Sequence, residues 1–417
     1  MTSFDLFLRG LNLSDDRIVA INGAHRVTRG ELYAAVAARR CAAMPRRRVL
    51  LRNSTPIEFA ADLLAALADD HVAVIPPNFQ PQTLATFADQ PAPIHVPPLT
   101  IELYTSGSSG EPKCVSKTLR QLEAESRILE GFWGTLAAGA TVIATTPHHH
   151  IYGLLFRLLW PLLAGRTFDN ATISEPTSFV ERLRATKVSV LVSSPAQLSR
   201  LHQLVDLANL PNRPALVFSS GGPLDPETAA SYEHSWGAAP TEVFGSTESG
   251  GIAWRRQDQS RFWRPLPEVQ LSSDPDGALL VRSPFLPDET PLRMEDAVEF
   301  NADGTFELRG RLDRIVKIEE KRLSLPDMEM WLSKHSSVAS AVVAPLVISG
   351  RTLLGAVVVL RSQSDRKSMI EMLRKHLSQR FDNVLLPRRW RFVDALPFNE
   401  RGKLVQAEVI RFLEAAQ

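Results

Sequence analysis

The stretch from Tyr104 to Lys113 combines glycines, small hydroxyl side chains and a lysine, a composition suited to holding a polyphosphate. Glycines let the backbone come close to phosphate oxygens, hydroxyl groups donate hydrogen bonds, and the Lys113 ammonium supplies positive charge. The pattern differs from G-x-x-x-x-G-K-[ST], because Glu111 and Pro112 separate the last glycine from the lysine. Alone, such a segment would favour a solvated hairpin turn between two strands. The candidate phosphate-binding residues before the lysine are Thr105, Ser106, Gly107, Ser108, Ser109 and Gly110.

This loop resembles the phosphate-binding loop of the adenylate-forming superfamily, which comprises acyl- and aryl-CoA ligases, peptide-synthetase adenylation domains and luciferases. Further segments similar to motifs of that family follow the loop in the family's order, so the chain is identified as a member of it. These segments are His150-Ile-Tyr-Gly153, Ser220-Gly-Gly-Pro-Leu224, Phe244-Gly-Ser-Thr-Glu248, Arg293-Met-Glu-Asp296, Gly310-Arg-Leu-Asp-Arg-Ile-Val-Lys317 and Gly402-Lys403.

The resemblance implies that ATP and a carboxylic acid form acyl-AMP and pyrophosphate, after which the acyl group passes to a thiol. Because the carboxylate oxygen attacks the α-phosphorus, the site must neutralise phosphate charge and hold the reactants in line. By the same resemblance, Lys113 and Thr247 contact the phosphates, and Lys403 reaches across from the C-terminal domain to the α-phosphate and the attacking carboxylate. These three residues are the candidate catalytic residues. A lone Gly-Lys pair in the tail would carry no such meaning without the other motifs.

The resemblance also assigns a magnesium ligand and the contacts to the nucleoside. Glu248 is expected to bind Mg2+, which prefers hard oxygen donors, although outside its motif it would be expected to be an exposed loop residue. Asp296 is expected to accept hydrogen bonds from the ribose hydroxyls, although Met294 and Glu295 depart from the family's usual Thr-Gly. Phe244 is assigned to the adenine face, where the family more often has Tyr, and alone it would be a core residue. The other nucleotide-binding candidates are Gly221, Gly222, Gly245, Ser246 and Arg311.

The acid-binding candidates are His150 and Tyr152 of the His-Ile-Tyr-Gly segment. Ser194-Pro195 and either Trp254 or Trp263 are expected to complete an apolar, partly aromatic cavity. Such a cavity suits an aromatic acid, such as a hydroxybenzoate or hydroxycinnamate, and a medium-chain fatty acid equally well. Three consecutive histidines end at His150, but neighbouring side chains point in different directions and no cysteine or carboxylate joins them, so zinc is not expected.

The segment Lys317-Ile-Glu-Glu-Lys-Arg322 departs from the family pattern Lys-Ile-x-Gly-x-Arg, whose glycine adjoins the pantetheine tunnel. Glu320 stands at the glycine position. Either its side chain restricts the tunnel and indicates a specialised acceptor, such as an acyl carrier protein, or the strand is shifted and Glu320 faces solvent. Acyl carrier proteins are typically acidic, so basic side chains on the small domain would steer their encounter. These side chains are Lys317, Lys321, Arg322, Lys375, Arg388 and Arg389.

The elements that must position these residues follow an α/β pattern, because helical and strand periodicities alternate along the chain. Glycines 221 and 222 follow a predicted strand at 215–219, and ligands of open α/β sheets bind at the carboxyl ends of strands. Many short strands and turns at 266–310 predict a small β-subdomain. Helices are predicted at 31–44, 56–68, 119–132, 151–163, 178–185, 325–335 and 368–380, and further strands at 48–52, 71–75, 140–145, 188–193, 338–347 and 353–360.

Two domains are expected. Residues 1–311 form a large N-terminal adenylation domain of layered α/β subdomains, with a first subdomain that is shortened relative to the family and the small β-subdomain at its end. Residues 312–417 form a small, mobile C-terminal α+β domain with Asp313 as the hinge and an irregular tail that carries Lys403. Outside the motif, Arg311 and Asp313 would be expected to be a surface ion pair.

Composition agrees with an ordinary globular protein: 417 residues, 44% hydrophobic and 22% charged. A net charge of +1 gives no general attraction to nucleic acid or anionic membrane. Cys41 and Cys114 are the two cysteines, too few for a disulfide framework, and Cys114 is expected to be a packed small residue. The start lacks the pattern of a signal peptide, and the apolar run at 154–163 is too short to span a bilayer. A cytoplasmic location is therefore expected.

The sequence thus predicts a stand-alone ligase that uses ATP and Mg2+ to activate an aromatic or fatty acid. The acceptor is a phosphopantetheine thiol, on a separate acyl carrier protein or on CoA. Three alternatives stay open: an ordinary acyl- or aryl-CoA ligase, an enzyme whose acceptor is an amine or which releases the adenylate, and a non-catalytic nucleotide-binding relative. The joint presence of Lys113, Glu248, Asp296 and Lys403 argues against the last, because a decayed site would be expected to lose a charged group.

Overall fold

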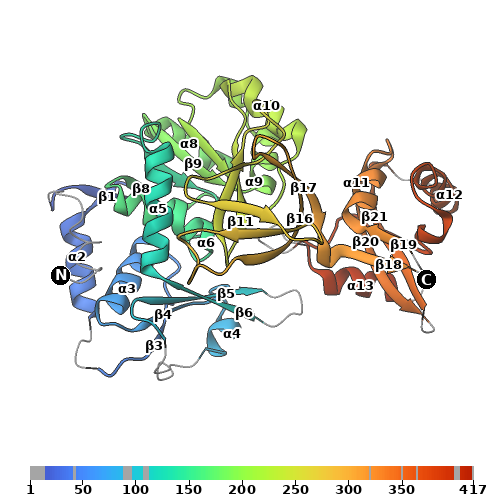
Figure 1. The fold of residues 1–417 in the computed structure, drawn as a ribbon. Coiled ribbons are helices and arrows are strands. Elements are labelled where there is room, and N and C mark those ends of the chain that lie inside the picture. Colours follow the sequence, from blue (N-terminus) through green and yellow to red (C-terminus); the bar gives the residue numbers. More distant parts are fainter. Residues whose placement is uncertain are drawn as a thin grey trace.

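The computed structural model of the chain describes residues 15–40, 44–87, 96–106, 112–318, 321–348, 351–362, 365–398 and 404–415. Within these residues, a large N-terminal part contains three sheets, and a smaller C-terminal part, at the right of Figure 1, contains two. The fold is mixed α/β, as predicted.

The largest sheet has nine strands, and its middle strands are parallel. β9 is buried along its whole length, because helices cover both faces of the sheet there. In sheet order the strands are β13 (Arg264–Pro265), β12 (Gly250–Arg255), β11 (Thr241–Ser246), β10 (Leu216–Ser219), β9 (Ser189–Ser193), β7 (Thr141–Ala144), β8 (Thr167–Thr172), β1 (Ile18–Asn22) and β2 (His25–Thr28). The helices that accompany this sheet are α8 (Pro176–Ala185), α9 (Pro195–Leu204) and α10 (Pro226–Trp236).

A second sheet carries the phosphate-loop hairpin. Its strands are β3 (Arg48–Leu50), β4 (Val72–Ile75), β5 (Thr100–Ser106) and β6 (Pro112–Thr118), with β5 and β6 antiparallel. The helices of this region are α2 (Arg29–Arg39), α3 (Pro56–Ala68), α4 (Pro81–Ala85) and α5 (Leu119–Trp133). Thr118 caps α5 directly after β6, because its hydroxyl accepts from the Gln121 N–H while the Gln121 side chain accepts from the Thr118 N–H.

The predicted β-subdomain is present as an antiparallel sheet of β14 (Gln270–Ser273), β15 (Ala278–Arg282), β16 (Leu292–Phe300) and β17 (Phe306–Arg311). The C-terminal part begins with the hairpin β18 (Ile315–Ile318) and β19 (Lys321–Ser324). It continues with α11 (Leu325–Ser333), β20 (Val338–Ile348), β21 (Arg351–Leu360), α12 (Arg366–Leu377), β22 (Arg389–Phe392) and α13 (Gln406–Glu414).

The hydrophobic cores of the two parts do not mix. Two clusters of buried residues draw on 19–306, and two others draw on 318–413. In the C-terminal part, alternate residues of β20 face opposite sides, so that Val343 packs with α11 and α12 while Val342 packs with Val409 and Leu413 of α13.

Two predictions about elements need correction. The tail after residue 380 is not irregular throughout, because β22 and α13 lie there; Val409 and Leu413 are four positions apart and bury one face of α13. The predicted helix 151–163 consists of α6 (Ile151–Gly153), a π-helical turn (Leu154–Leu159) and α7 (Trp160–Leu163). The Trp160 N–H bonds to the carbonyl of Leu155, five residues back, and the next residue, Pro161, has no N–H to donate.

Candidate active site

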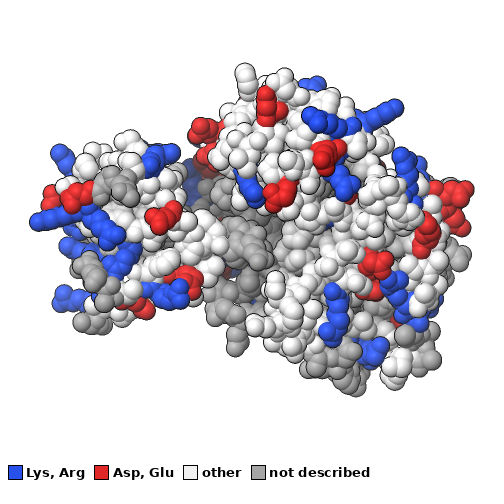
Figure 2. All heavy atoms as spheres, turned by 180° about the vertical axis from the view of Figure 1, so that it is seen from behind, with Lys and Arg blue, Asp and Glu red and all other residues white. Residues whose placement is uncertain are grey.

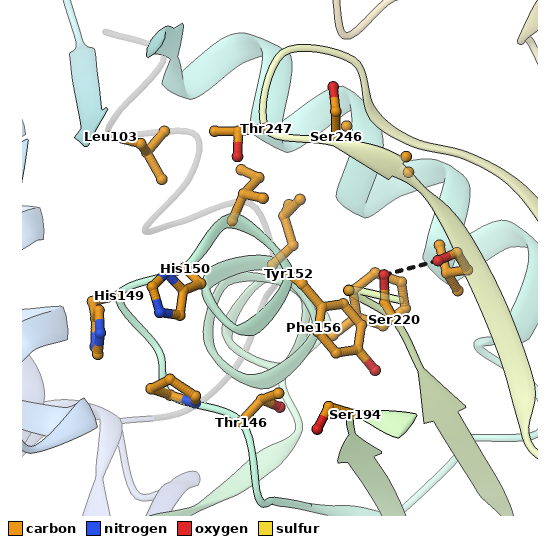
Figure 3. A pocket seen from close by; sticks show the side chains of 18 of the residues that line it. Leu103, Thr146, His149, His150, Tyr152, Phe156, Ser194, Ser220, Ser246 and Thr247 are labelled. Atoms are coloured by element: carbon orange, nitrogen blue, oxygen red, sulfur yellow. Dashed lines mark hydrogen bonds between the residues drawn. The ribbon is translucent and has the colours of Figure 1, made fainter. Parts of the chain in front are cut away.

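A cavity of about 230 Å3 opens where β7, β9, β10 and β11 end. Figure 3 shows side chains from both sheets and from the helix that begins after His150 converging on it. This is the crevice expected at the carboxyl ends of parallel strands. The predicted site residues that line it are Thr105, His150, Tyr152, Gly221, Gly245, Ser246 and Thr247.

Lys113 meets Glu248, the residue that follows Thr247 of the cavity lining. The Lys113 ammonium donates to Oε1 of Glu248 over 2.7 Å, although the two residues are 135 positions apart. Partial burial would raise the pKa of Glu248, but bonds from Lys113 and Ser246 outweigh burial and lower it. The carboxylate is therefore ionised at neutral pH, and its side chain is 35% exposed. An ionised, accessible carboxylate is what a hard cation needs as a ligand.

The turn that carries Thr247 and Glu248 is tied by its own hydroxyl groups. The Ser246 N–H donates to Oγ of Ser249 over 2.9 Å, and the Ser249 N–H donates back to Oγ of Ser246 over 3.1 Å. Gly245 is required by close approach, because a Cβ there would lie 1.9 Å from the Gly250 carbonyl oxygen.

The turn after β10 is held by contacts that the motifs did not predict. The Ser220 hydroxyl donates to the Val243 carbonyl over 2.8 Å, the bond dashed in Figure 3, and Gly221 has a φ of +92°. The Leu224 N–H donates to the buried carboxylate of Glu242, which also accepts two bonds from Arg255 at 2.8 and 3.0 Å. The sequence could not predict the role of Glu242, because its carboxylate joins two strands and a turn that are separate along the chain.

The far end of the cavity is aromatic and hydroxyl-rich. Tyr152 and Phe156 lie one turn apart with ring centroids 5.0 Å apart, and Thr146 and Ser194 line the same space (Figure 3). Burial raises the pKa of Tyr152 well above its usual value, so its hydroxyl stays protonated. Phe156 was not predicted, although its position four residues after Tyr152 on a helix was a usable signal.

The two predicted tryptophan walls are wrong. Trp254 packs on Trp133 and Phe132, and Trp263 packs on Phe244, so neither lines the cavity. Both tryptophans pack against other aromatic rings away from the cavity. The sequence pattern of such a residue is the same as that of a residue that lines a pocket.

The three histidines belong to an aromatic cluster. His148 stacks on Phe79 with centroids 5.8 Å apart, and His149 meets the same ring edge-on at 4.7 Å. Burial lowers the pKa of His148 to about 3, so this ring is neutral. Within the described residues, no group of three or more His, Cys, Asp or Glu side chains is placed to share a metal ion.

The ribose and adenine candidates lie outside the cavity lining. Asp296 and Arg311 are paired positions of β16 and β17, and their charged groups are 3.7 Å apart. The Phe244 ring packs against Trp263 and Phe306, so its contact with adenine stays a prediction. Ser106 ends β5, and Gly222 is exposed, as is Gly221 before it.

Several predicted residues fall outside the described part of the chain: Gly107, Ser108, Ser109, Gly110, Glu320 and Lys403. The same holds for the side chains of Asp313, Lys317 and Arg322. Cys114, expected to be packed, is exposed on β6. Among the described residues, every helix is too short or too polar to cross a bilayer.

Comparison with known proteins places this geometry in a family. The sequence profile of the AMP-binding enzyme family matches residues 16–276, and that of the AMP-binding enzyme C-terminal domain matches residues 327–403. A 4-coumarate–CoA ligase of Rhodobacter capsulatus is 28% identical over 302 residues, which cover 72% of this chain and 73% of the relative. A D-alanine–D-alanyl carrier protein ligase of Staphylococcus epidermidis is 26% identical over 343 residues, covering 74% and 70%.

Solved structures show the same fold. ATP-bound MatB of Rhodopseudomonas palustris superposes with a TM-score of 0.79 at 18% identity, over 97% of this chain and 98% of that one. The o-succinylbenzoate CoA synthetase MenE of Bacillus subtilis, in complex with its acyl-adenylate intermediate, gives 0.81 at 16% identity, over 99% and 98%. This chain therefore belongs to the AMP-binding enzyme family, and it is an adenylate-forming acid–thiol ligase.

Proposed function

We propose that this enzyme activates an aromatic carboxylic acid with ATP and Mg2+ and passes the acyl group to the phosphopantetheine thiol of an acyl carrier protein. The observation that carries the proposal is a single cavity with two chemically different ends. Thr105, Thr247 and the nearby Lys113–Glu248 pair suit phosphates, whereas Tyr152 and Phe156 suit a flat ring.

At the phosphate end, the Lys113–Glu248 ion pair would be replaced by contacts with the bound nucleotide and metal. Lys113 would turn to the phosphate oxygens, and Glu248 would hold Mg2+, which needs few protein carboxylates because it keeps several waters. The ionised, partly exposed Glu248 carboxylate fits that role. When bound, the metal supplies positive charge to the pyrophosphate that leaves. The Thr247 hydroxyl would donate to the α-phosphate, and Lys403 would add charge there as the acid attacks.

At the acid end, a short aromatic acid is favoured over a long alkyl chain. The ring pair Tyr152 and Phe156 offers a flat apolar surface, and the hydroxyls of Thr146 and Ser194 could bond a polar substituent. His150 lies at the start of the same helix and lines the path to it. Relatives named for 4-coumarate and anthranilate support this class of acid. A medium-chain fatty acid is the second candidate, because the cavity lining is largely apolar.

The charge of the small domain supports a carrier protein as the acceptor. Residues 312–417 hold 18 Lys and Arg against 12 Asp and Glu, whereas residues 1–311 hold 29 against 34. Figure 2 shows Lys and Arg gathered on the C-terminal lobe, at its left. Lys375 and Arg388 are exposed residues of this part of the chain, and an acidic partner would be drawn to them. The relative named a D-alanyl carrier protein ligase supports the same acceptor class.

The separate cores support a domain boundary between Arg311 and Leu312, with Asp313 as the hinge. Such a boundary would let the small domain turn between the two half-reactions, bringing Lys403 to the phosphates for the first. ATP and holo carrier proteins are found together in the cytoplasm, so the proposal places the enzyme there.

A pyrophosphate-release screen without acceptor tests the first half of the proposal. Benzoate, hydroxybenzoates, hydroxycinnamates and alkyl acids of rising chain length are compared at fixed ATP and Mg2+. Aromatic acids should give the highest kcat/KM. A maximum with alkyl acids would move the enzyme to the fatty acid class, and no release with any acid would favour a non-catalytic relative. Thioester formation with CoA and with a holo carrier protein then tests the second half.

A further inference from the structure

Two buried charged residues that no motif includes lie beneath the Glu248 turn. Lys117, in β6, is 3% exposed, and Glu125, in the second turn of α5, is 1% exposed. Burial raises the pKa of Glu125 to about 7 and lowers that of Lys117, and in each case the charge of the other residue opposes the effect. Burying such groups is costly unless they are held by specific partners, so the partners are informative.

Lys117 holds the backbone of the proposed metal ligand. Side chains four positions apart on a strand share a face, so Lys113 and Lys117 both point from β6 toward Glu248. Lys113 bonds to the carboxylate of Glu248, whereas Lys117 donates to its backbone carbonyl. Lys117 also donates to the Phe285 carbonyl over 2.9 Å, so one ammonium ties the turn to the segment before β16.

Glu125 holds the other end of the same turn. Its Oε1 accepts from the Gly251 N–H over 2.7 Å, and a Cβ on Gly250 would lie 2.5 Å from its Oε2. Gly250 has a φ of +71°, a conformation that favours glycine. The two glycines therefore let the turn settle directly on the carboxyl group.

We propose that Lys117 and Glu125 are positioning residues that hold the Thr247–Glu248 turn in place for phosphate and Mg2+. The inference rests on the proposed role of Glu248. Thr118, which lies between Lys117 and Glu125, caps α5 directly after β6. The end of β6 and the start of α5 therefore form one rigid base that carries the Lys117 and Glu125 side chains. The turn joins two antiparallel strands and has no helix of its own, so contacts with this base add to the Ser246–Ser249 bonds in limiting its movement.

A matched control contacts the same helix from outside it. Arg166 is 7% exposed, forms an ion pair with Glu130 of α5, and donates to the carbonyls of Gly134 and Ala137, each over 2.9 Å. It is also a buried cation that ties a helix to a loop, but neither it nor Glu130 lines the cavity. Arg166→Met should thus cost stability without disturbing the Glu248 turn.

The experiment compares Lys117→Met, Glu125→Gln and Arg166→Met in the full-length protein. Amide hydrogen exchange of residues 246–251 is measured without ligand, and the Mg2+ concentration for half-maximal pyrophosphate release is measured with the preferred acid. Lys117→Met should raise exchange of the turn at least about tenfold and raise the Mg2+ requirement several-fold, whereas Glu125→Gln should have the smaller effect. Arg166→Met should lose comparable stability and change neither.

Unchanged exchange and unchanged Mg2+ dependence in Lys117→Met would overturn the inference, as would equal changes in Arg166→Met. If Lys117→Met does not fold, Lys117→Met with Glu125→Gln removes both charges and carries the same two measurements. The exchange arm needs no reaction, so it separates this inference from the proposed function. If Glu248→Gln leaves the Mg2+ dependence unchanged, the role of Glu248 fails, and exchange alone then decides whether the pair holds the turn.

Discussion

The crevice and the small C-terminal domain use charge in opposite ways. Around the crevice, charged side chains are paired and aimed: Lys113 meets the Glu248 carboxylate, and Lys117 meets the carbonyl of the same residue. On the small domain, basic side chains such as Lys375 and Arg388 are exposed. Exposed surface charges contribute little to stability but shape the field that a partner meets. The charges around the crevice therefore fix the position of Glu248, whereas the exposed charges of the small domain affect how fast a partner protein approaches.

The sharpest test of this division removes the residue expected to cross between the two regions. Lys403→Ala should lower acid-dependent pyrophosphate exchange by about two orders of magnitude or more, roughly 3 kcal/mol of lost transition-state stabilisation. Transfer from a supplied acyl-adenylate should suffer far less, because Lys403 is proposed to act only while the adenylate forms. Measuring both half-reactions on one preparation decides the matter, and equal losses would contradict a two-conformation mechanism.

The next largest effect is expected inside the crevice. Glu248→Gln keeps the size of the side chain and removes its charge, so adenylation should fall at least about tenfold and need more Mg2+. The fold should survive, since the Glu248 side chain is 35% exposed and lies outside the hydrophobic cores. A magnesium titration of pyrophosphate release is the measurement, with thermal unfolding as the control. Full activity with an unchanged titration would make Glu248 a bystander.

A smaller effect is expected from exposed basic residues of the small domain. Lys375→Glu combined with Arg388→Glu should lower kcat/KM for a holo carrier protein several-fold and leave that for CoA unchanged. Added salt should weaken carrier loading by the wild type more than loading by this variant, because screening acts on the steering that the variant has lost. Lys187→Glu, on the exposed surface of the large domain, is the matched control. A preference for CoA, with no effect of salt on carrier loading, would instead place this protein among the ordinary acyl-CoA ligases.

The smallest effect concerns stability and pH at the base of the crevice. Burial raises the pKa of Glu125 to about 7 from 4.5, so the folded protein keeps a proton that the unfolded chain releases. This contribution to stability is complete below pH 4.5 and is lost as pH rises through about 7. Relative to Glu125→Gln, the wild type should lose on the order of 3 kcal/mol across that window. Urea unfolding at several pH values measures it, and parallel curves for the two proteins would contradict it.

Local signals carried much of the fold and part of the site. The helix at 56–68 was predicted to the residue, since Pro56 opens it and apolar side chains fill it. Short motifs predicted Thr247, Gly221 and Tyr152 as site residues, and all three line the cavity. In contrast, β1, β2, α9 and α10 were not predicted, and Trp254 was assigned to the wrong surroundings. Aromatic residues have similar patterns in a core and in a pocket wall, so only their neighbours separate the two.

The amino-acid sequence by itself determined the family, the reaction class and the residues of the short motifs, because those motifs need particular residue types within a few positions of one another. Only the tertiary structure decided what supports them. Lys117 and Glu248 are 131 positions apart, and Glu125 and Gly251 are 126 apart, so neither contact leaves a local trace. Such contacts depend on strand order and on where α5 starts, and these are set by packing of the whole domain.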